Sequence, residues 1–344
     1  MIDRIRGKEF RGPTLVTQAA LSALSEASRV SKSRSPKEFV VEQSAFGDML
    51  VKTRPTAILL ANGVRRVIDA VRMGADQGSN VPALQETVSK TVDSFLAEIK
   101  QSVDKIGEIG ARRLRSGDTV LCYGYSTSVL SIVQKAQEHG KNLKVIVSES
   151  RPELEGRLMA QELLKLNLPT TMIIDSAVSY FIKDVDRVLT GADAVSANGA
   201  VINKIGTATV AAIAHLLMVN VSVAASVYKF SPETILGERI EIEELDRSLV
   251  ISRELMTHFK GMKIRNPAFD VTPPDHIDVI VTERGMIPPQ GAMILRQYET
   301  GLFVQAYAGM YPFSNIATNY RPCYWRRLCG AERMNQFSRN SNLR

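Results

Sequence analysis

The pattern of apolar residues changes once along the chain, and this change limits which folds the chain can adopt. Before about residue 115, apolar side chains recur at steps of three and four residues, which is typical of amphipathic helices. The expected helices are 13–30, 36–52, 56–77 and 82–114. Ser116-Gly117-Asp118 then breaks the pattern, and short apolar runs begin to alternate with amphipathic segments.

The short apolar runs predict the strands of a parallel sheet. They are Thr119–Cys122, Leu143–Val147, Thr170–Ile174, Arg187–Leu189, Val221–Ala225 and Ile277–Val281. Helices are expected between the first five runs, at 127–139, 156–166, 176–182 and 207–218. Strands separated by helices imply a parallel sheet that is covered on both faces.

These patterns together predict an α/β protein in three parts. A helical N-terminal domain covers 1–115, a Rossmann-like domain with a mostly parallel sheet covers 116–300, and a divergent basic tail covers 301–344. Residues 226–276 interrupt the alternation, so we expect them to leave the sheet and to pack against a partner.

The positive charge of the chain is concentrated near its C-terminus. The formal net charge is +7, and residues 311–344 hold six arginines against one acid, Glu332, which leaves about +2 for the rest. A nearly neutral body lacks the broad basic surface of a nucleic-acid-binding domain, so direct nucleic-acid binding is not expected. The tail also holds Tyr320, Tyr324 and Trp325, and stacking of these rings on nucleic-acid bases is the alternative.

The sequence lacks the signals of membrane, secreted, metal-binding and Walker-type nucleotide-binding proteins. No apolar run approaches the roughly 18 residues that a membrane-spanning helix needs, and the first residues lack the apolar core of a signal peptide. We therefore expect a cytoplasmic protein without a membrane partner. The four histidines show no metal-ligand spacing and no Walker-type loop is present, so neither a metal nor a cofactor is predicted.

The segment 188–207 carries the strongest indication of a binding site. Its apolar run ends in Gly191-Ala192-Asp193, which puts a carboxylate at the carboxyl end of a strand, where open α/β sheets bind ligands. After a glycine-containing loop come Asn203 and Lys204, directly before an expected helix start at Gly206-Thr207. A lysine and a helix N-terminus both favour an anion, so a phosphate site is predicted, the alternative being residues that only cap and turn.

Four further motifs carry candidate ligand-binding residues. Gly124 and Ser126 follow the first strand, and Glu155 follows the second. Arg11-Gly12 and Arg54 lie beside turns, and an arginine can donate two hydrogen bonds to one phosphate. In contrast, Cys122 lies inside an apolar run and is expected to be a buried structural thiol.

Taken in order, these motifs resemble one known family. It unites methylthioribose-1-phosphate isomerase, archaeal ribose-1,5-bisphosphate isomerase and the alpha, beta and delta subunits of translation initiation factor 2B. The resemblance runs from about residue 1 to 297, on Arg11-Gly12, Arg54-Pro55-Thr56, Tyr123-Gly-Tyr-Ser126, Ser150-Arg-Pro152 with Glu155-Gly156, Gly191-Ala-Asp193, Asn203-Lys204-Ile-Gly-Thr207, and Thr272-Pro-Pro274 with Ile287-Pro-Pro289.

The resemblance implies a fold, an assembly and a set of roles. It implies a helical domain, a Rossmann-like domain, and dimers built mainly through the latter. In the isomerases an aldose 1-phosphate is opened and converted to a ketose, with a cysteine and an aspartate as the proposed acid–base pair. By position Asp193 matches the aspartate, Arg11 and Arg54 match arginines that hold the phosphorylated sugar, and Asn203-Lys204 match an Asn-Lys pair.

Two departures from the isomerases bear on activity. The position of their cysteine is Gly124 here, and Cys122 lies two residues earlier, about 6–7 Å away along a strand. A glutamine of the isomerases is Glu155 here, and a carboxylate would repel an anionic substrate.

Both departures favour a non-enzymatic regulatory subunit like those of initiation factor 2B. Such a subunit would keep a pocket for a sugar phosphate or nucleoside monophosphate, form a dimer or higher oligomer, and bind initiation factor 2. The alternative is an active ribose-1,5-bisphosphate isomerase in which Asp193 transfers protons and Cys122 substitutes for the missing cysteine.

Overall fold

The computed structural model describes residues 12–231, 234, 237, 240–259 and 261–292. All of the described residues belong to one compact unit. Tail 301–344 lies outside the described residues, and so does Arg11.

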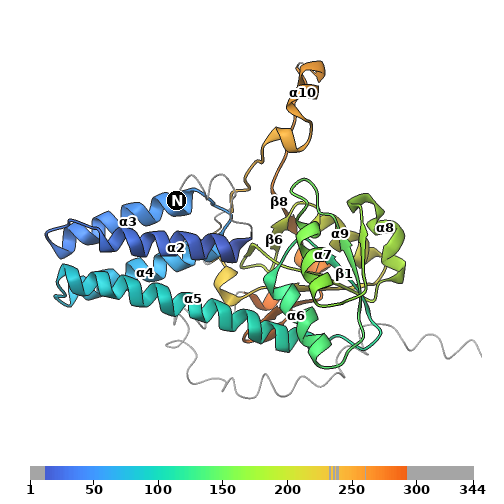
Figure 1. The fold of residues 1–344 in the computed structure, drawn as a ribbon, viewed down its shortest axis with the longest axis horizontal. Coiled ribbons are helices and arrows are strands. Elements are labelled where there is room, and N and C mark those ends of the chain that lie inside the picture. The colour runs from blue at the N-terminus through green and yellow to red at the C-terminus, as the bar shows by residue number, and fades with distance from the viewer. Residues whose placement is uncertain (1–11, 232–233, 235–236, 238–239, 260, 293–344) are drawn as a thin grey trace, which may run out of the picture. The chain divides into compact units, whose positions relative to one another are not determined.

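Among the described residues, four helices form the N-terminal part, as the period of the apolar residues predicts. They are α2 (Pro13–Arg29), α3 (Pro36–Lys52), α4 (Ile58–Asp76) and α5 (Val81–Ala111). Pro13, Pro36 and Pro82 each lie in the first turn of a helix, where proline's missing N–H leaves no bond unmade. The helices pack into a bundle (Figure 1) around a mainly apolar core.

A sheet of seven strands follows the bundle. The strands are β1 (Thr119–Tyr123), β2 (Lys144–Ser148), β3 (Thr170–Ile173), β4 (Arg187–Thr190), β7 (Asn220–Ala224), β9 (Val279–Thr282) and β10 (Gly285–Ile287). Their spatial order is β10-β9-β7-β4-β1-β2-β3, and every neighbouring pair except β10–β9 is parallel. The predicted fold class, a helical region followed by a mostly parallel sheet, is confirmed.

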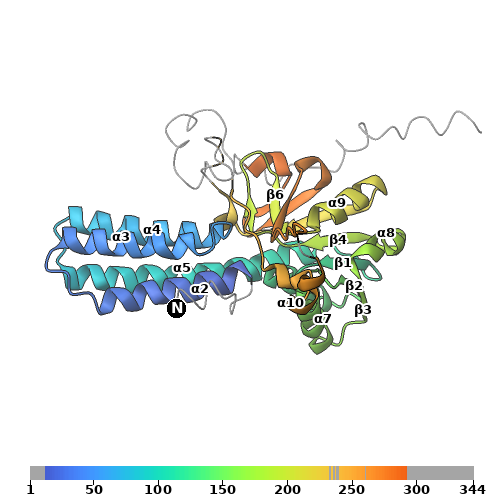
Figure 2. The ribbon, with the colours of Figure 1, turned by 90° about the horizontal axis from the view of Figure 1, so that it is seen from above.

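Helices cover both faces of this sheet (Figures 1 and 2). On one face the C-terminal part of α5 packs with α6 (Thr127–Glu138) and α7 (Glu155–Lys165). On the other face lie α8 (Val178–Phe181) and α9 (Thr207–Leu216). Within the described ranges, no helix is both long enough and apolar enough to cross a membrane.

A second, three-stranded sheet was not predicted. It consists of β5 (Ala194–Val195), β6 (Val201–Lys204) and β8 (Phe269–Thr272), all paired antiparallel. Asn203 and Lys204 follow the glycine-containing loop, as predicted, but they lie on a short strand that was not predicted. The strand was missed because its partner β8 is distant in sequence, so no local period reveals the pairing.

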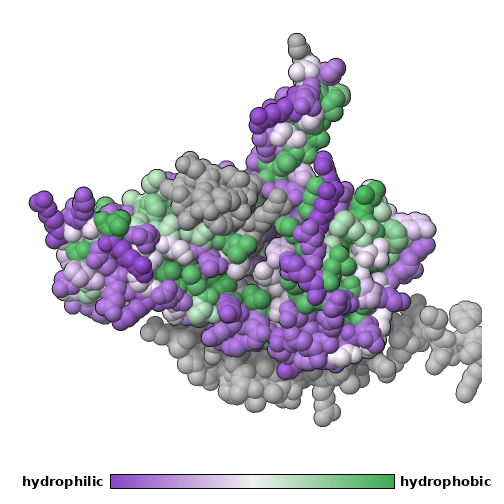
Figure 3. All heavy atoms as spheres, in the orientation of Figure 1, coloured by the Kyte–Doolittle hydropathy of each residue, from purple (hydrophilic) through white to green (hydrophobic). Residues whose placement is uncertain are grey.

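The segment before β8 leaves the sheet, as predicted. It includes α10 (Arg253–Met256) and projects from the Rossmann-like part (Figure 1). Val250, Leu255 and Phe259 on it are exposed, and Figure 3 shows apolar side chains along this projection. That it packs against a partner stays a prediction.

Helix α5 connects the bundle to the sheet, because its 31 residues take part in two cores. Its first half contributes Phe95 and Ile99 to the core of the bundle, and its second half contributes Ile106 and Ala111 to the core under the sheet. One continuous helix therefore fixes the orientation of the bundle relative to the sheet.

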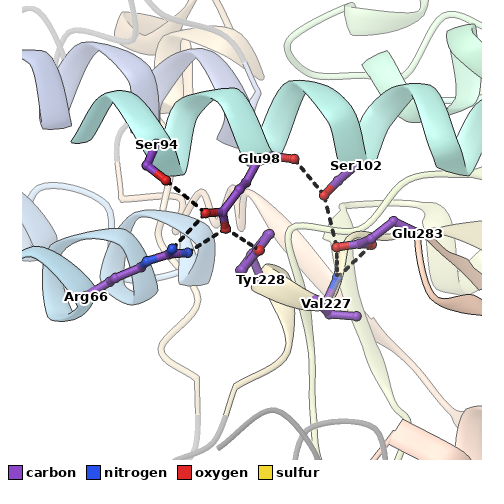
Figure 4. Close-up of polar contacts among 7 residues, drawn as sticks. All are labelled: Arg66, Ser94, Glu98, Ser102, Val227, Tyr228 and Glu283. Carbon is purple, nitrogen blue, oxygen red and sulfur yellow. Dashed lines mark hydrogen bonds and ion pairs between the residues drawn. The ribbon is translucent and has the colours of Figure 1, made fainter. Parts of the chain in front are cut away.

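A polar network on α5 strengthens this connection (Figure 4). Glu98 accepts two hydrogen bonds from Arg66 of α4, at 2.6 and 2.7 Å, and one from the hydroxyl of Tyr228 at 2.7 Å. One turn further along, the Ser102 hydroxyl donates to Glu283 at 3.1 Å, and Glu283 accepts from the amide of Val227. The short helix η3 (Val227–Lys229) is thus held to α5 through charged hydrogen bonds.

We predict that Glu98→Gln lowers the free energy of unfolding by about 1–2 kcal/mol. The substitution removes the ion pair with Arg66 and the charge that strengthens the hydrogen bond from Tyr228, at a partly exposed site. The Arg66 guanidinium lowers the pKa of Glu98 in the folded state. The stabilisation is therefore present above the ordinary pKa of 4.5 and is lost as the pH falls through the lower folded-state pKa. Urea titrations at pH 7 and pH 4 measure both effects.

Glu86→Gln is the matched control, because Glu86 lies on the same helix and, within the described ranges, forms an ion pair only with the exposed Lys90. It should unfold like the wild type at both pH values. Equal behaviour of the two variants would contradict a role for Glu98 in joining the domains.

Candidate functional site

The sheet order places a crevice between β1 and β4. From β1 the chain runs outward to β2 and β3, whereas β4, β7 and β9 extend the sheet in the other direction. Such a reversal leaves a gap at the carboxyl ends of the two central strands, where open α/β sheets bind their ligands. Gly124 and Ser126 follow β1 at this point, and Gly191 and Asp193 follow β4.

Two adjoining pockets open at this crevice, and both are lined by Gly12, Pro13, Tyr125, Asp193 and Asn203. The first, here called the Lys229 pocket, is completed by Thr14, Leu15, Ser126, Thr127, Gly191, Ala192 and Lys229. The second, here called the Glu155 pocket, is completed by Arg54, Gly124, Glu155, Lys204 and Phe269.

The pockets bring together all the predicted site residues that the structure describes. These are Gly12, Arg54, Gly124, Ser126, Glu155, Asp193, Asn203 and Lys204. Arg11 lies outside the described residues. Residues from the bundle and from both sheets therefore meet at one place, and their roles there stay predictions.

Asp193 lines both pockets and is surrounded by cations. Burial raises the pKa of its carboxyl group, and the positive charges of Lys204, Lys229 and Arg54 offset part of this rise. Among the described residues, none donates a hydrogen bond to its side chain. A carboxyl group in this setting holds its proton more tightly than an exposed aspartate, and it lines the pocket without a hydrogen-bond partner from the described part of the chain.

Lys204 is shared by two carboxylates. Its ammonium group donates to Glu153 at 2.5 Å and lies 3.4 Å from an oxygen of Glu155. It also lies 4.9 Å from the centroid of the Phe269 ring. Burial lowers the pKa of Lys204, but the charges of Glu155, Glu153 and Asp193 outweigh this and leave it raised. Lys204 therefore remains a fixed positive charge.

Two other predicted residues are held by neighbours. Arg54 is buried, and its Nε lies 3.3 Å from an oxygen of Glu243, which keeps its side chain at the wall of the pocket. Asn203 is buried too, and its amide donates to the hydroxyls of Thr190 and Thr207, each at 2.9 Å. Both side chains are pre-positioned, so little order has to be created when a ligand binds.

Lys229 was not predicted from the sequence as a site residue. It is buried at 5 % exposure, lines the first pocket and donates to the carbonyl of Ala192 at 2.6 Å. Burial lowers its pKa, and the charges of Asp193 and Glu283 partly restore it. Lys229 lies a few residues beyond the carboxyl end of β7. The rule that pointed to Asp193, a polar residue after the carboxyl end of a strand, would therefore have identified it.

The predicted anion site at the start of α9 is occupied by the protein itself. The amide of Gly206 donates to Asp270 at 2.7 Å, and that of Ala208 donates to the same carboxylate at 3.1 and 3.2 Å. Burial raises the pKa of Asp270 to about 6. The prediction that this helix end offers free N–H groups to a phosphate is wrong.

Two other helix N-termini face the Lys229 pocket. The first residues of α2, from Gly12 to Leu15, line it together with Ser126 and Thr127 at the start of α6. Gly12, the N-cap of α2, makes no side-chain capping bond, whereas the Ser126 hydroxyl caps α6 by accepting from Val129. Two helix dipoles and the Lys229 ammonium group therefore favour an anion in this pocket.

Gly191 allows the close approach of the two central loops. A Cβ atom at this position would lie 2.8 Å from both Cβ and Oγ of Ser126. A glycine is therefore required where the loop after β4 passes the start of α6.

Cys122 cannot take the place of a thiol at position 124. Its side chain packs in the core beneath the sheet with Val120, Val129 and Leu189, and it lines neither pocket. It is 1 % exposed, and burial raises the pKa of its thiol to about 12. The structure therefore confirms the buried structural thiol, and the alternative in which Cys122 substitutes as an acid or base is wrong.

No group of three or more His, Cys, Asp or Glu residues in the described ranges could hold a metal ion. The titratable side chains that line the pockets are carboxyl, amino, guanidinium and phenol groups.

The sequence pattern of the initiation factor 2 subunit family matches residues 9–289. The chain belongs to this family. The matched range covers every described site residue, so the family assignment extends to the crevice itself.

Several relatives resemble the chain over most of its length. A ribose 1,5-bisphosphate isomerase of Thermococcus kodakarensis is 39% identical over 300 residues, which is 87% of this chain and 93% of that protein. One of Methanocaldococcus jannaschii is 41% identical, over 86% and 93% of the two chains. A methylthioribose-1-phosphate isomerase of Acetivibrio thermocellus is 33% identical, over 86% and 90%.

Among solved structures, translation initiation factor eIF-2B, subunit delta, from A. fulgidus is 31% identical, with a TM-score of 0.66. The match covers 84% of this chain and 87% of that one. The isomerases and the initiation factor subunits share one fold, so the fold alone does not separate the two functions.

These relatives overturn the prediction of a non-enzymatic regulatory subunit. Six archaeal relatives at 38–41% identity are ribose 1,5-bisphosphate isomerases, which favours the alternative stated from the sequence. The error came from giving two side chains, Gly124 and Glu155, more weight than the pocket around them.

We predict that Gly191→Ala lowers the free energy of unfolding by about 1–3 kcal/mol and weakens binding of inorganic phosphate, because Ser126 must move. Gly291→Ala is the control, since its new Cβ would lie no nearer than 3.6 Å to any other group. Urea denaturation and calorimetric phosphate titration of both variants measure the effects. Unchanged stability and phosphate affinity in Gly191→Ala would show that the two loops are not tightly packed.

Proposed function

We propose that this protein is an aldose–ketose isomerase that converts ribose 1,5-bisphosphate, or a closely related sugar 1-phosphate, to the corresponding ketose. The observation that carries the proposal is the carboxyl group of Asp193, which faces both pockets and receives no hydrogen bond from the described residues. The names of the relatives support the substrate class, because both kinds of isomerase act on a ribose that bears a phosphate on C1.

The chemistry of this reaction suits a carboxyl group with a raised pKa. A ring-closed sugar 1-phosphate must accept a proton on its ring oxygen as the ring opens, and a proton must then move from C2 to C1. Burial raises the pKa of Asp193, which favours its protonated form more than in an exposed aspartate and so suits a proton donor.

The two pockets suit the two ends of a phosphorylated sugar. The Lys229 pocket offers an ammonium group and two helix N-termini, which favours a phosphate group there. The Glu155 pocket offers Arg54 and Lys204 beside Asp193, which suits the end where the ring opens. Arg11, outside the described residues, is proposed as a further phosphate ligand.

A dimer or higher oligomer stays a prediction. The tetrameric eIF2B-beta2-delta2 complex of C. thermophilum shares the fold, with a TM-score of 0.65. Light scattering of the purified protein would measure the oligomeric state directly.

We expect the purified protein to convert ribose 1,5-bisphosphate to ribulose 1,5-bisphosphate. Phosphorus NMR measures this conversion. Asp193→Asn should lower kcat about 10²–10⁴-fold, because the amide cannot donate and take back the proton. Asp186→Asn is the control, since that carboxylate accepts a bond from Thr119 at the opposite end of the strands. Absence of turnover by the wild type on this and other sugar 1-phosphates would refute the function. Turnover by Asp193→Asn at the wild-type rate would refute only the role of Asp193.

Lys229→Met tests the phosphate end separately. We expect KM to rise about 10–100-fold with a smaller change in kcat, as for the loss of one charged hydrogen bond to a phosphate. Lys90→Met, on the exposed face of α5, is the control. An unchanged KM in Lys229→Met would place the phosphate elsewhere in the crevice.

A further inference from the structure

The proposed reaction needs a second group that transfers protons. While one group protonates the ring oxygen, another must remove the proton from C2, and later a proton must be delivered to C1. One carboxyl group cannot hold and release both protons at once. The inference below rests on the proposed function and asks which residue supplies the second group.

Few of the described residues that line the pockets qualify. No histidine or cysteine is among them, and Arg54 and Lys204 remain charged in ion pairs. The hydroxyl of Tyr125 lies near the charges of Glu162 and Lys165 on α7, neither of which lines a pocket. Lys229 donates to the carbonyl of Ala192 and is proposed to hold the phosphate. Besides Asp193, this leaves the carboxyl group of Glu155.

Glu155 is held in place by its own backbone. It is the first residue of α7, and the helix start is pressed against the end of β2 at Gly156, where a Cβ would lie only 1.7 Å from the carbonyl oxygen of Ser148. The residue is 8 % exposed. Its side chain therefore has little freedom and lines the same pocket as Asp193 and Gly124.

One oxygen of Glu155 is directed to a cation and the other is available. Oε1 lies 3.4 Å from the ammonium group of Lys204, whereas Oε2 receives no hydrogen bond from the described residues. Gly124 has no side chain to fill the pocket, and a Cβ there would lie 3.8 Å from Lys204. Gly124 and Glu155 line the same pocket, so the space that a side chain at position 124 would occupy belongs to the pocket that Glu155 lines.

We propose that Glu155 is the second catalytic residue, a base that acts opposite Asp193 across the same pocket. The Glu155 carboxylate takes the proton from C2 as the bond between C1 and the ring oxygen breaks, and Asp193 gives its proton to that oxygen. The product of this step is an enol with the phosphate on C1. Glu155 then returns a proton to C1 while Asp193 takes the proton of the C2 hydroxyl, which yields the ketose. Both residues regain their starting states, and no other reactant is consumed.

The charges in the pocket favour this division of roles. Lys204 lies against Glu155 and stabilises its anion, whereas the positive charges of Lys204, Lys229 and Arg54 act on Asp193 without a direct ion pair among the described residues. Burial raises the pKa of both carboxyl groups, and the charge of Asp193 adds to the rise at Glu155. Two interacting carboxyl groups beside one lysine favour the state in which one is ionised and the other protonated.

The test compares Glu155→Gln with Glu153→Gln, using ribose 1,5-bisphosphate as the probe. Both variants remove one carboxylate partner of Lys204, but Glu153 lines neither pocket. Glu155→Gln should lower kcat about 10²–10⁴-fold with KM unchanged or lower. Glu153→Gln should keep kcat within several-fold of the wild type. Thermal melting of both variants shows that they are folded.

The pH dependence separates catalysis from positioning. In the wild type, kcat/KM should fall at low pH as Glu155 takes up a proton and at high pH as Asp193 loses one. The groups that act on Glu155 are Lys204, Asp193 and Glu153. Glu155→Asp should retain part of the activity and the acidic limb, and Glu155→Gln should lose that limb.

Three results would overturn the inference, and they differ from failure of the function itself. Glu155→Gln could turn over like the wild type while Asp193→Asn does not, or it could lower kcat no more than Glu153→Gln does. It could also lose activity yet keep the acidic limb. In each case the isomerase function stands and Glu155 is not the base. If the wild type turns over no sugar 1-phosphate, both proposals fall.

Discussion

The packing of α5 into two cores is the constraint on which the rest of the structure depends. The helix carries Phe95 in the bundle and Ile106 beneath the sheet, so neither half can shift without breaking apolar contacts. Close to the point where the two cores meet, Glu98 binds Tyr228, whose ring also meets Phe95 edge-on at 5.1 Å between centroids. Lys229 is the next residue along the chain, so the bundle fixes an ammonium group of the proposed site.

The site is a nearly balanced set of buried charges. Arg54, Lys204 and Lys229 supply the positive charge, and Asp193 and Glu155 supply the negative charge within the pockets. Burying a charge is costly unless it is compensated, so these groups stabilise one another. Burial raises the pKa of Asp193 and of Glu155, and the neighbouring cations offset part of each rise.

Much of this arrangement could be predicted from the sequence, and the failures have physical reasons. Apolar periods located α2 to α5 and six of the seven strands of the large sheet, because those elements bury apolar faces. The short edge strand β10 was not predicted. The pairing of β6 with β8 could not be predicted from a local period, since it joins distant segments. Nor could the capping of α9 by Asp270, which arrives from the same distant strand.

The position of α5 in the chain also determines which apolar surfaces are synthesised before the segments that cover them. A chain made from its N-terminus completes α5 before any strand of the sheet exists, so the apolar surface around Ile106 emerges without its partners. It stays uncovered until the segments that carry Val120 and Ile132 follow. The surface of α4 that receives Tyr228 waits longer still, through more than a hundred further residues. A nascent chain of this protein thus presents an unfinished helix face to its surroundings for much of its translation.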